Sequence, residues 1–496
     1  MSLAAVVLVV IATVTIGIFG LRLSRTTSDF YVASRTVSPL WNASAIGGEY
    51  LSAASFLGIA GLILAYGADM LWLPVGWTGG YLVLLVLVSA PLRRSGAYTL
   101  PDFAEARLES MRVRRAASVL VVLIGWFYLM PQFQSAGLVL RTLTGAPVWA
   151  GGLLVAVVVV VNVLSGGMRS ITFVQAFQYW LKLTALAVPV VFLLLAWRGD
   201  GAPGITDQQW LMPLAGTREH PVYATYSLIL ATFLGTMGLP HVLVRFYTNP
   251  DGRAARRTTL VVLALLGAFY LLPALYGALG RIYAPDLLVS GHGDAVVLTL
   301  PERVVGGALG DVLGALVTAG AFAAFLSTSS GLTVSVAGVI AQDILHGGVR
   351  SFRAATLVAV AMPLILATMA RALPVADVVG LAFAVAASTF CPLLVLGIWW
   401  RRLTDAGALA GLLVSGGLAC TAVMWTIVSG PLRGWPGVLL AQPAAWTVPI
   451  AFGVMVVVSL LTPGRIPVGV ARTMVRLHAP ETLDVDRGDW HPRGGL

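Results

Sequence analysis

Charged side chains are scarce in this chain. Asp, Glu, Lys and Arg make up 10% of its 496 residues, whereas hydrophobic residues make up 58%. Soluble domains usually carry about 25% charged residues, so this composition excludes a water-soluble fold. Lysine occurs once, at Lys182, and most arginines lie in short loops between long apolar runs. The composition predicts an all-α polytopic membrane protein.

Several functional classes lack their sequence signatures here. The two cysteines, Cys391 and Cys420, both lie in apolar runs, so we expect no disulfide. The six histidines show no metal-ligand spacing, no nucleophile–base pair stands out, and there is no Walker A sequence. We therefore expect no enzyme activity, no organic cofactor, no nucleic-acid partner and no obligatory protein partner.

Apolar runs of about 20 residues, the length that crosses a bilayer, occur thirteen times. They cover 2–21, 41–66, 72–91, 115–140, 148–165, 171–197, 222–246, 259–280, 306–341, 354–372, 375–400, 406–429 and 444–462. The excess of arginine in alternate loops predicts a plasma-membrane protein with its N-terminus outside and its C-terminus in the cytoplasm. We expect the tail to be largely disordered. Tryptophans near span ends are interpreted as an interfacial belt: Trp41, Trp72, Trp77, Trp149, Trp399 and Trp400.

Two of the predicted spans are interrupted by helix breakers, at Ala45–Ser52 (AIGGEYLS) and Gly235–His241 (GTMGLPH). In lipid, non-helical backbone is tolerated only where it lines a buried site or cavity. Spans two to six and seven to eleven form two sets of five, and each set opens with an interrupted span. This order predicts a five-plus-five inverted repeat with a binding site near the membrane midplane. The expected divisions are 1–40 (first helix and loop), 41–197 (repeat 1), 222–400 (repeat 2), 401–462 (two further helices) and 463–496 (tail).

Ionisable residues inside membrane spans are costly and therefore suggest function. Glu49 suits cation attraction or proton coupling, or pairing with a neighbouring helix. Lys182 suits attraction of an anionic substrate, or pairing with a carboxylate. His241 is interpreted as a buried neutral histidine bonded to backbone, and Arg245 as a side chain that reaches toward the cytoplasmic surface.

The richest hydroxyl cluster within a span is Ala324–Ser330 (AFLSTSS). Hydroxyls and unwound backbone carbonyls offer the oxygens that Na⁺ needs. Small residues also let transmembrane helices pack closely, so the pattern alone supports both interpretations equally.

Five segments carry a recognisable pattern: Asp29–Arg35 (DFYVASR), Glu49–Gly58 (EYLSAASFLG), Gly238–Phe246 (GLPHVLVRF), Gly331–Thr333 (GLT) and Gly380–Ser388 (GLAFAVAAS). Together they resemble the sodium:solute symporters, and within them the cation/acetate and monocarboxylate branch. The resemblance implies a LeuT-type inverted-repeat fold. It also implies secondary active uptake of a small monocarboxylate, such as acetate, propionate or pyruvate, coupled to Na⁺.

The resemblance further implies a sodium site made by carbonyls of the broken first core helix and oxygens of the eighth. The matching positions are Gly48, Leu51, Ala324, Ser327 and Thr328. Some family members carry an acidic residue three positions before the glutamine of the sixth span. Here Thr172 precedes Gln175, which argues against a second sodium site that uses such a carboxylate.

A carboxylate substrate suits the free amide groups and half-helix N-termini at the two breaks. The candidate contacts are Tyr50, Ser52, Ser55, Gln132, Gln134, Gly238 and His241, while Glu49 and Lys182 are candidates for coupling or charge balance. For the two glutamines, interhelical hydrogen bonding is an equal alternative.

Three other functions remain open at this stage. They are symport of an amino acid such as proline, coupling to H⁺ through Glu49 in place of Na⁺, and a receptor built on a transporter scaffold. The sequence does not choose among small monocarboxylates, because one methylene in an apolar pocket changes binding by only about 1–3 kcal/mol.

Overall fold

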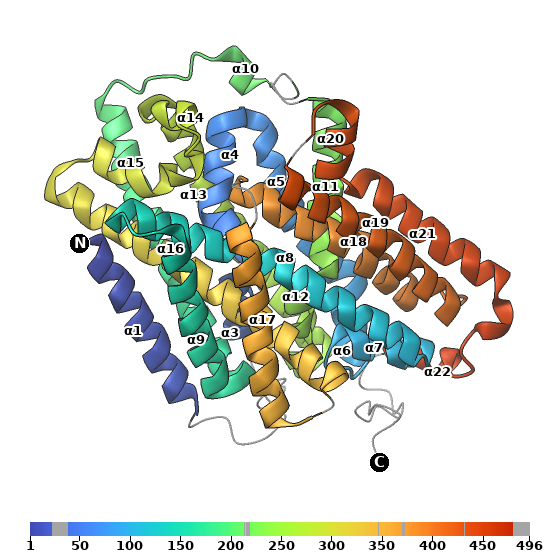
Figure 1. Cartoon of the computed structure of the whole chain (residues 1–496). Coiled ribbons are helices and arrows are strands. Elements are labelled where there is room, and N and C mark those ends of the chain that lie inside the picture. Colours follow the sequence, from blue (N-terminus) through green and yellow to red (C-terminus); the bar gives the residue numbers. More distant parts are fainter. Residues whose placement is uncertain are drawn as a thin grey trace.

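The computed structural model of the chain describes residues 1–21, 38–212, 214, 219–345, 347–369, 373–430 and 432–479. These residues form helices and connecting segments, with no strand among them. Figure 1 shows a helical bundle in which α1 (Ser2–Leu21) starts at the N-terminus and runs along one edge of the bundle. The predicted all-α fold is confirmed. The segment Asp29–Arg35 lies outside the described residues.

The first half of the chain builds the elements on either side of the first interruption. Pro39 lies at the first position of α3, and Gly145 follows the last residue of α8 in a left-handed conformation. Both are typical of helix boundaries. After α1 come α3 (Pro39–Tyr50), η2 (Ala54–Gly58), α4 (Ile59–Tyr66), η3 (Gly67–Leu71), α5 (Trp72–Val83), η4 (Leu84–Val88), α6 (Ser89–Arg94), α7 (Leu100–Leu108), α8 (Met111–Thr144) and α9 (Val148–Gly199).

The second half contains the other interruption and the additional C-terminal helices. Its elements are α10 (Gln208–Leu211), α11 (Pro221–Gly238), α12 (Pro240–Val244), η5 (Phe246–Thr248), α13 (Gly252–Tyr283), α14 (Asp286–Val289), η6 (Gly293–Ala295), α15 (Val296–Val304), α16 (Gly307–Val339), η7 (Ile340–Ile344), α17 (Val349–Met369), α18 (Val375–Trp399), α19 (Asp405–Ser429), α20 (Gly434–Ala441), α21 (Ala444–Leu461), η8 (Pro463–Arg465) and α22 (Val470–His478).

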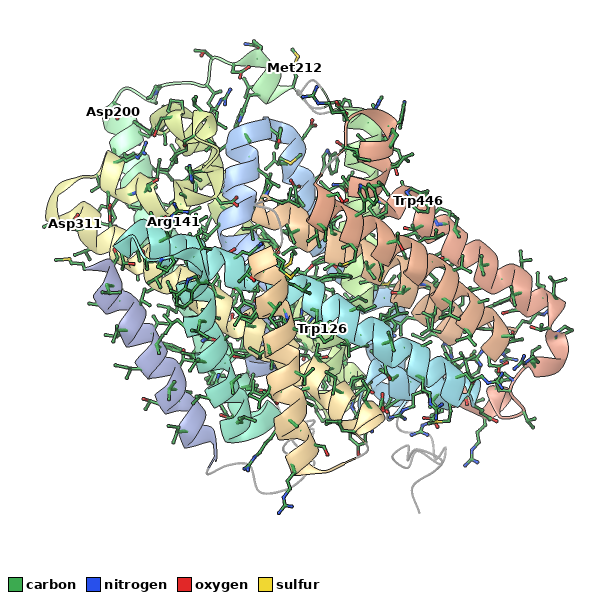
Figure 2. All side chains as sticks on the ribbon, in the orientation of Figure 1. Trp126, Arg141, Asp200, Met212, Asp311 and Trp446 are labelled. Carbon is green, nitrogen blue, oxygen red and sulfur yellow. The ribbon has the colours of Figure 1, made fainter. Side chains whose placement is uncertain are left out.

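Ten helical runs in the described part are long and apolar enough to cross a membrane. Two further apolar helices, Ser2–Ile18 and Val148–Leu164, are shorter. The protein is therefore a multi-pass membrane protein. Side chains of Asp200, Met212 and Asp311 lie toward the side that carries α10 and α14, whereas Trp126 of α8 lies near the middle of the view (Figure 2).

One helix covers two predicted spans. The predicted spans 148–165 and 171–197 both fall within α9, which runs without interruption from Val148 to Gly199. Its two parts nevertheless lie beside the same residue of α1. The Ser170 hydroxyl donates to the Gly17 carbonyl at 2.8 Å, and a Cβ on Gly17 would meet the Asn162 side chain.

The C-terminal segment differs from the expectation of disorder. Residues Val470–His478 form α22, which buries Met474 and Leu477. The Arg94 guanidinium at the end of α6 donates to the carbonyls of Leu477 and His478, at 3.4 and 3.3 Å. Those two bonds and the buried apolar face hold the start of the tail against the bundle. Residues 480–496 lie outside the described part.

A buried charge cluster ties together α7, α8 and η7. Arg114 lies 2.9 Å from Asp102, 2.6 Å from Glu105 and 2.6 Å from Asp343. Asp102 also completes a capping box with Thr99 at the start of α7. Burial raises the pKa of Asp102 to about 6, against the attraction of Arg114. The cluster links the start of α8 to α7, which precedes it, and to η7, 229 positions later in the chain. These ion pairs therefore fix the position of the first turn of α8.

Candidate functional site

The first interruption is a short non-helical segment between α3 and η2. Helix α3 ends at Tyr50, and Leu51 follows with φ −74° and ψ 84°. Gln132 of α8 accepts the Ala53 N–H at 3.0 Å and donates to the Tyr128 carbonyl at 3.3 Å. A buried N–H without a partner would cost about 1–3 kcal/mol, so Gln132 stabilises the break.

The second interruption is a single extended residue between α11 and α12. Leu239 has φ −76° and ψ 115°, and Pro240 begins α12. A residue before proline disfavours helical backbone, and proline is well suited to the first helical position. Helix α11 approaches α18 so closely that a Cβ on Gly238 would meet the Ala386 carbonyl. Both interruptions predicted from the sequence are confirmed.

Three of the five residues predicted to bind sodium contact the Lys182 ammonium, and hydrogen bonds link the other two to Ser327 and to Glu49. Lys182 Nζ lies 2.5 Å from the Gly48 carbonyl, 2.7 Å from the Leu51 carbonyl and 3.0 Å from Ser327 Oγ. The Ser327 hydroxyl donates to the Ala324 carbonyl at 3.1 Å.

Thr328 completes the predicted set, and its hydroxyl donates to the Glu49 carbonyl at 2.6 Å. Helices α3, α9 and α16 therefore meet here, where the ammonium of Lys182 in α9 donates to oxygens of α3, of the break and of α16. These carbonyl and hydroxyl oxygens are the kind of ligand that Na⁺ requires. The position that faces three of them is occupied by Nζ of Lys182.

Glu49 and Arg245 form a buried ion pair across the interruptions. Arg245 Nε lies 2.8 Å from Glu49 Oε2, and both side chains are almost completely buried. The interpretation of Arg245 as a side chain that reaches the surface is therefore wrong. The sequence position near a span end was misleading, because η5 and the turn after α12 keep this residue inside the bundle. Among the alternatives for Glu49, the pairing with a neighbouring helix is confirmed.

Arg245 also connects to α9 and, through it, to the lysine. Its guanidinium donates to Thr172 Oγ1 at 2.7 Å and to Gln175 Oε1. Gln175 Nε2 in turn donates to the Ser327 carbonyl at 2.8 Å. Thr172 thus accepts a hydrogen bond from the guanidinium of Arg245, a cation that is part of the protein. The acidic residue that some family members carry at this position would instead bind a sodium ion.

A cluster of buried aromatic rings lies beside the two interruptions. The Phe383 ring of α18 contacts the rings of Tyr50, Trp77 and Tyr128, at centroid distances of 6.2, 5.6 and 5.8 Å. Tyr81 lies edge-on to Tyr50 at 4.9 Å. We call these five residues, Tyr50, Trp77, Tyr81, Tyr128 and Phe383, the aromatic cluster.

Several polar atoms at this cluster are buried without a hydrogen-bond partner. They are Ser52 Oγ, Trp77 Nε1, Tyr81 Oη and both ring nitrogens of His241. Buried polar groups are normally paired, so a concentration of unpaired ones between two helix breaks indicates a binding site for a polar solute. His241 is buried as expected, with its ring 5.2 Å from that of Tyr128, but the expected backbone partner is missing.

Of the residues predicted to contact substrate, most lie at the two interruptions. The Tyr50 hydroxyl bonds Thr236 Oγ1 at 2.9 Å, which links α3 to α11. The Ser55 hydroxyl bonds the Tyr270 hydroxyl at 3.1 Å. Gln134 is the exception. It lies two residues from Gln132, on the opposite face of α8, and donates to the Ala367 carbonyl of α17 at 3.2 Å, so the structure separates it from this group.

Three residues of the aromatic cluster, Trp77, Tyr81 and Phe383, were not among the predicted contacts. Trp77 was assigned to the interfacial belt but is 1% exposed and belongs to the aromatic cluster. Its place six residues inside a predicted span was the available signal. Tyr81 lies one helical turn further along α5, and Phe383 lies in a span that is nearly all buried. Aromatic residues in apolar runs resemble ordinary core packing, so nothing in the sequence singled them out.

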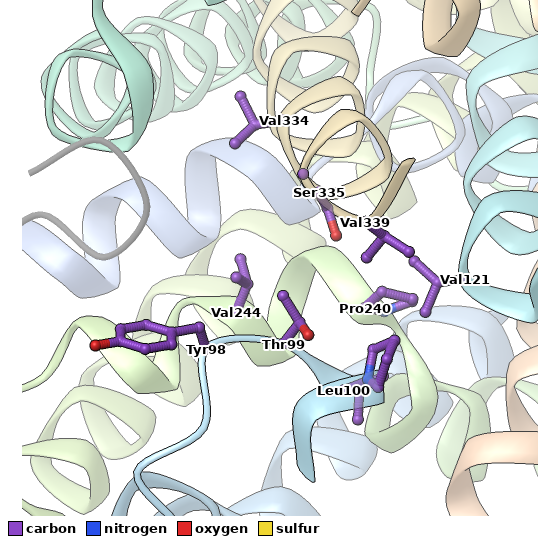
Figure 3. A pocket seen from close by; sticks show the side chains of 11 residues that line it. Tyr98, Thr99, Leu100, Val121, Pro240, Val244, Val334, Ser335 and Val339 are labelled. Carbon is purple, nitrogen blue, oxygen red and sulfur yellow. The ribbon is translucent and has the colours of Figure 1, made fainter. Parts of the chain in front are cut away.

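A pocket lies on one side of the second interruption (Figure 3). Pro240 and Val244 of the α12 segment form one wall, and Val334, Ser335, Gly338 and Val339 of α16 form another. The remaining lining residues are Tyr98, Thr99, Leu100 and Pro101 at the start of α7, and Val121 of α8. This pocket reaches Pro240, the first residue after the break.

Gln132 and Gln134 offer a matched test of the break. Gln132→Leu should destabilise the folded protein by about 1–3 kcal/mol, because it leaves the Ala53 N–H buried and unpaired. Gln134→Leu should have a smaller effect, since this side chain is only partly buried. Thermal unfolding of the two purified variants in the same detergent measures the difference. Equal stability of both variants would show that Gln132 does not support the break.

Comparison with known proteins decides the family. The sequence profile of the sodium:solute symporter family matches residues 30–415. The chain belongs to the sodium:solute symporter family. It is 33% identical over 467 residues to the uncharacterized symporter YwcA of Bacillus subtilis, covering 89% of this chain and 90% of that one. It is 31% identical over 504 residues to a monocarboxylic acid transporter of Corynebacterium glutamicum, covering 91% and 90%.

A solved structure of a symporter supports the fold. The chain is similar to a Na⁺-coupled sialic acid symporter in a substrate-bound, outward-open state, with TM-score 0.72 and 15% identity, covering 93% of this chain and 97% of that one. Together with the two helix interruptions, this likeness establishes the LeuT-type inverted-repeat fold. This symporter-family chain is thus a transporter and not an enzyme.

Proposed function

We propose that this symporter takes up a small monocarboxylate, such as acetate, propionate or pyruvate, by cation-coupled alternating access. The observation that carries the proposal is the group of unpaired buried polar atoms beside the two helix breaks. The similarity to a monocarboxylic acid transporter over most of both chains supports the substrate class.

The charge distribution of the breaks suits one anion and one cation. Helix α3 points its C-terminal, negative end at Lys182, whose Nζ contacts the last carbonyls of that segment. The helix that continues from Ala54 presents its N-terminal, positive end on the far side of the same break. A carboxylate would therefore bind beside Ser52, at the start of this second half-helix.

The aromatic cluster favours a small substrate. Ring centroids within it lie between 4.9 and 6.2 Å apart, which is ordinary packing contact. A solute with one to three carbon atoms would require small shifts of these rings. The unpaired Trp77 Nε1 and Tyr81 Oη are hydrogen-bond donors that would reach the solute from α5.

We infer that substrate leaves through the pocket beside Pro240. It lies between α12, α16 and the start of α7, adjacent to the second break. In our proposal, rocking of the α12 segment away from α16 opens this pocket toward the binding site. The predicted topology places this end of the bundle in the cytoplasm.

The test is tracer uptake of labelled acetate into proteoliposomes that contain the purified protein. Gradients of Na⁺ and of H⁺ are imposed separately, because family membership implies Na⁺ and the sequence left H⁺ open. Unlabelled acetate, propionate, pyruvate and proline are added as competitors. Inhibition by the three acids but not by proline is the expected result. Inhibition by proline alone would replace the monocarboxylate with an amino acid.

A further inference from the structure

We propose that the Lys182 ammonium is a built-in replacement for the sodium ion, so that transport by this protein does not use Na⁺ at this site. The inference concerns the coupling site of the transporter and rests on the proposed function. The family name leads one to expect a sodium ion at this site. In the structure, Nζ of Lys182 occupies the space between α3, α9 and α16.

The ammonium uses its full bonding capacity on the oxygens of the site. A lysine ammonium has three N–H donors, and Nζ has three acceptors within 3.0 Å: the carbonyls of Gly48 and Leu51, and Ser327 Oγ. Sodium bound to those oxygens would occupy the same point. Lys182 is 0% exposed, so it has no nearby solvent into which it could move aside.

The surrounding charges disfavour a second cation. The Glu49 carboxylate is paired with Arg245 at 2.8 Å through Oε2, and its Oε1 is buried without a hydrogen-bond partner. On α16, Ser327 and Thr328 contribute hydroxyl and carbonyl oxygens, which carry no formal charge. On the α12 side, Arg245 adds positive charge and the unpaired His241 adds none when neutral. Sodium beside Lys182 would place two positive charges a few ångströms apart in a buried region, where repulsion is strong.

The choice of residue supports the same conclusion. Lys182 is the one lysine in the sequence, among 31 basic residues that are otherwise arginine. Lysine carries a compact charge on a flexible stem, whereas arginine presents a planar fork. A compact cation can lie between the end of α3 and the hydroxyls of α16, as a sodium ion would. The tethered charge therefore holds the two helices together without a dissociable ion.

The first measurement is the response of the purified wild-type protein to Na⁺. Thermal unfolding is recorded in NaCl and in choline chloride of equal ionic strength, and ²²Na⁺ binding is measured directly. Neither measurement requires a working transport assay. We expect the same melting temperature in both salts and no saturable ²²Na⁺ binding. Saturable binding that Ser327→Ala leaves unchanged would place sodium at another site and leave the role of Lys182 intact. Binding to the wild type that Ser327→Ala abolishes would overturn the proposal.

The second measurement asks whether removing the tethered charge creates a sodium site. Lys182→Ala leaves the oxygens of the site without their cation, and Lys182→Ser is the alternative if the alanine variant does not fold. Either variant should gain ²²Na⁺ binding and melt several degrees higher at a Na⁺ concentration of about one hundred times the Kd. Adding Ser327→Ala should remove that gain, which assigns it to this site. A folded variant without any gain would contradict the proposal.

Uptake then separates failure of this inference from failure of the proposed function. Acetate uptake by wild type that is equally fast in choline and sodium buffers supports both. Uptake that requires Na⁺, together with ²²Na⁺ binding that Ser327→Ala abolishes, overturns the inference and leaves the monocarboxylate proposal intact. Absence of acetate uptake in every buffer rejects the proposed substrate, and the Na⁺-binding results above still decide the role of Lys182.

Discussion

Replacing Arg245 with leucine should strongly destabilise the protein, by about 3–5 kcal/mol, because it leaves the Glu49 carboxylate buried without its partner. The pair is 2.8 Å apart, and the side chains of both residues are at most 2% exposed. The same change removes the donors to Thr172 and Gln175. We expect a large loss of folded protein after extraction, measured by size-exclusion chromatography and thermal unfolding.

The controls distinguish a buried charge from a general loss of arginine. Arg141→Leu removes an exposed guanidinium and should leave unfolding unchanged. Glu49→Gln combined with Arg245→Leu removes both charges and should recover part of the stability lost in the single variant. An Arg245→Leu variant that unfolds at the wild-type temperature would contradict a structural role for this ion pair.

Gly48→Ala should abolish transport and reduce the yield of folded protein. A Cβ on Gly48 would meet the backbone carbonyl of Gln175, which a side-chain rotation cannot relieve. The Gly48 carbonyl also accepts from Lys182, so any displacement of α3 disturbs the cation site. Overpacking alone typically destabilises a protein by about 1–3 kcal/mol. We expect transport by the variant to fall further than this loss of folded protein would explain.

The matched control is Gly417→Ala in α19, where nothing lies within 4 Å of an added Cβ. This substitution should preserve uptake, because alanine favours helix and meets open space. Acetate uptake per amount of folded protein compares the two variants directly. Wild-type uptake by Gly48→Ala would show that α3 does not approach α9 as closely as the structure places it.

Much of the fold could be predicted because it depends on hydropathy and helix breakers. Long apolar runs located the spans, and glycine and proline located both interruptions to within a few residues. The fate of Arg245 could not be predicted, because its burial depends on η5 and on a partner 196 positions away in the sequence. The same limit applies to Trp77 and Phe383, whose contacts join separate spans.

Lys182 was predicted to attract an anionic substrate or to balance charge, and not to bind the oxygens of the predicted sodium site. The lysine and the hydroxyl cluster were each identified, and they are separated by 145 positions. The hydrogen bonds in the structure are needed to see that the Lys182 ammonium lies where the oxygens of the hydroxyl cluster and of the first break converge. Gln132 and Gln134 show the converse case, since two similar residues in one helix face different neighbours.

The most direct test of the monocarboxylate site compares two serines with the same local property. Ser52 Oγ and Ser415 Oγ are both buried without a hydrogen-bond partner, but only Ser52 lies at a helix break. If Ser52 binds the carboxylate, Ser52→Ala should raise the KM for acetate uptake about tenfold, since one hydrogen bond to a charged group contributes about 1.5 kcal/mol or more. Ser415→Ala should leave KM unchanged. Equal KM values for wild type and both variants would contradict the placement of substrate beside Ser52.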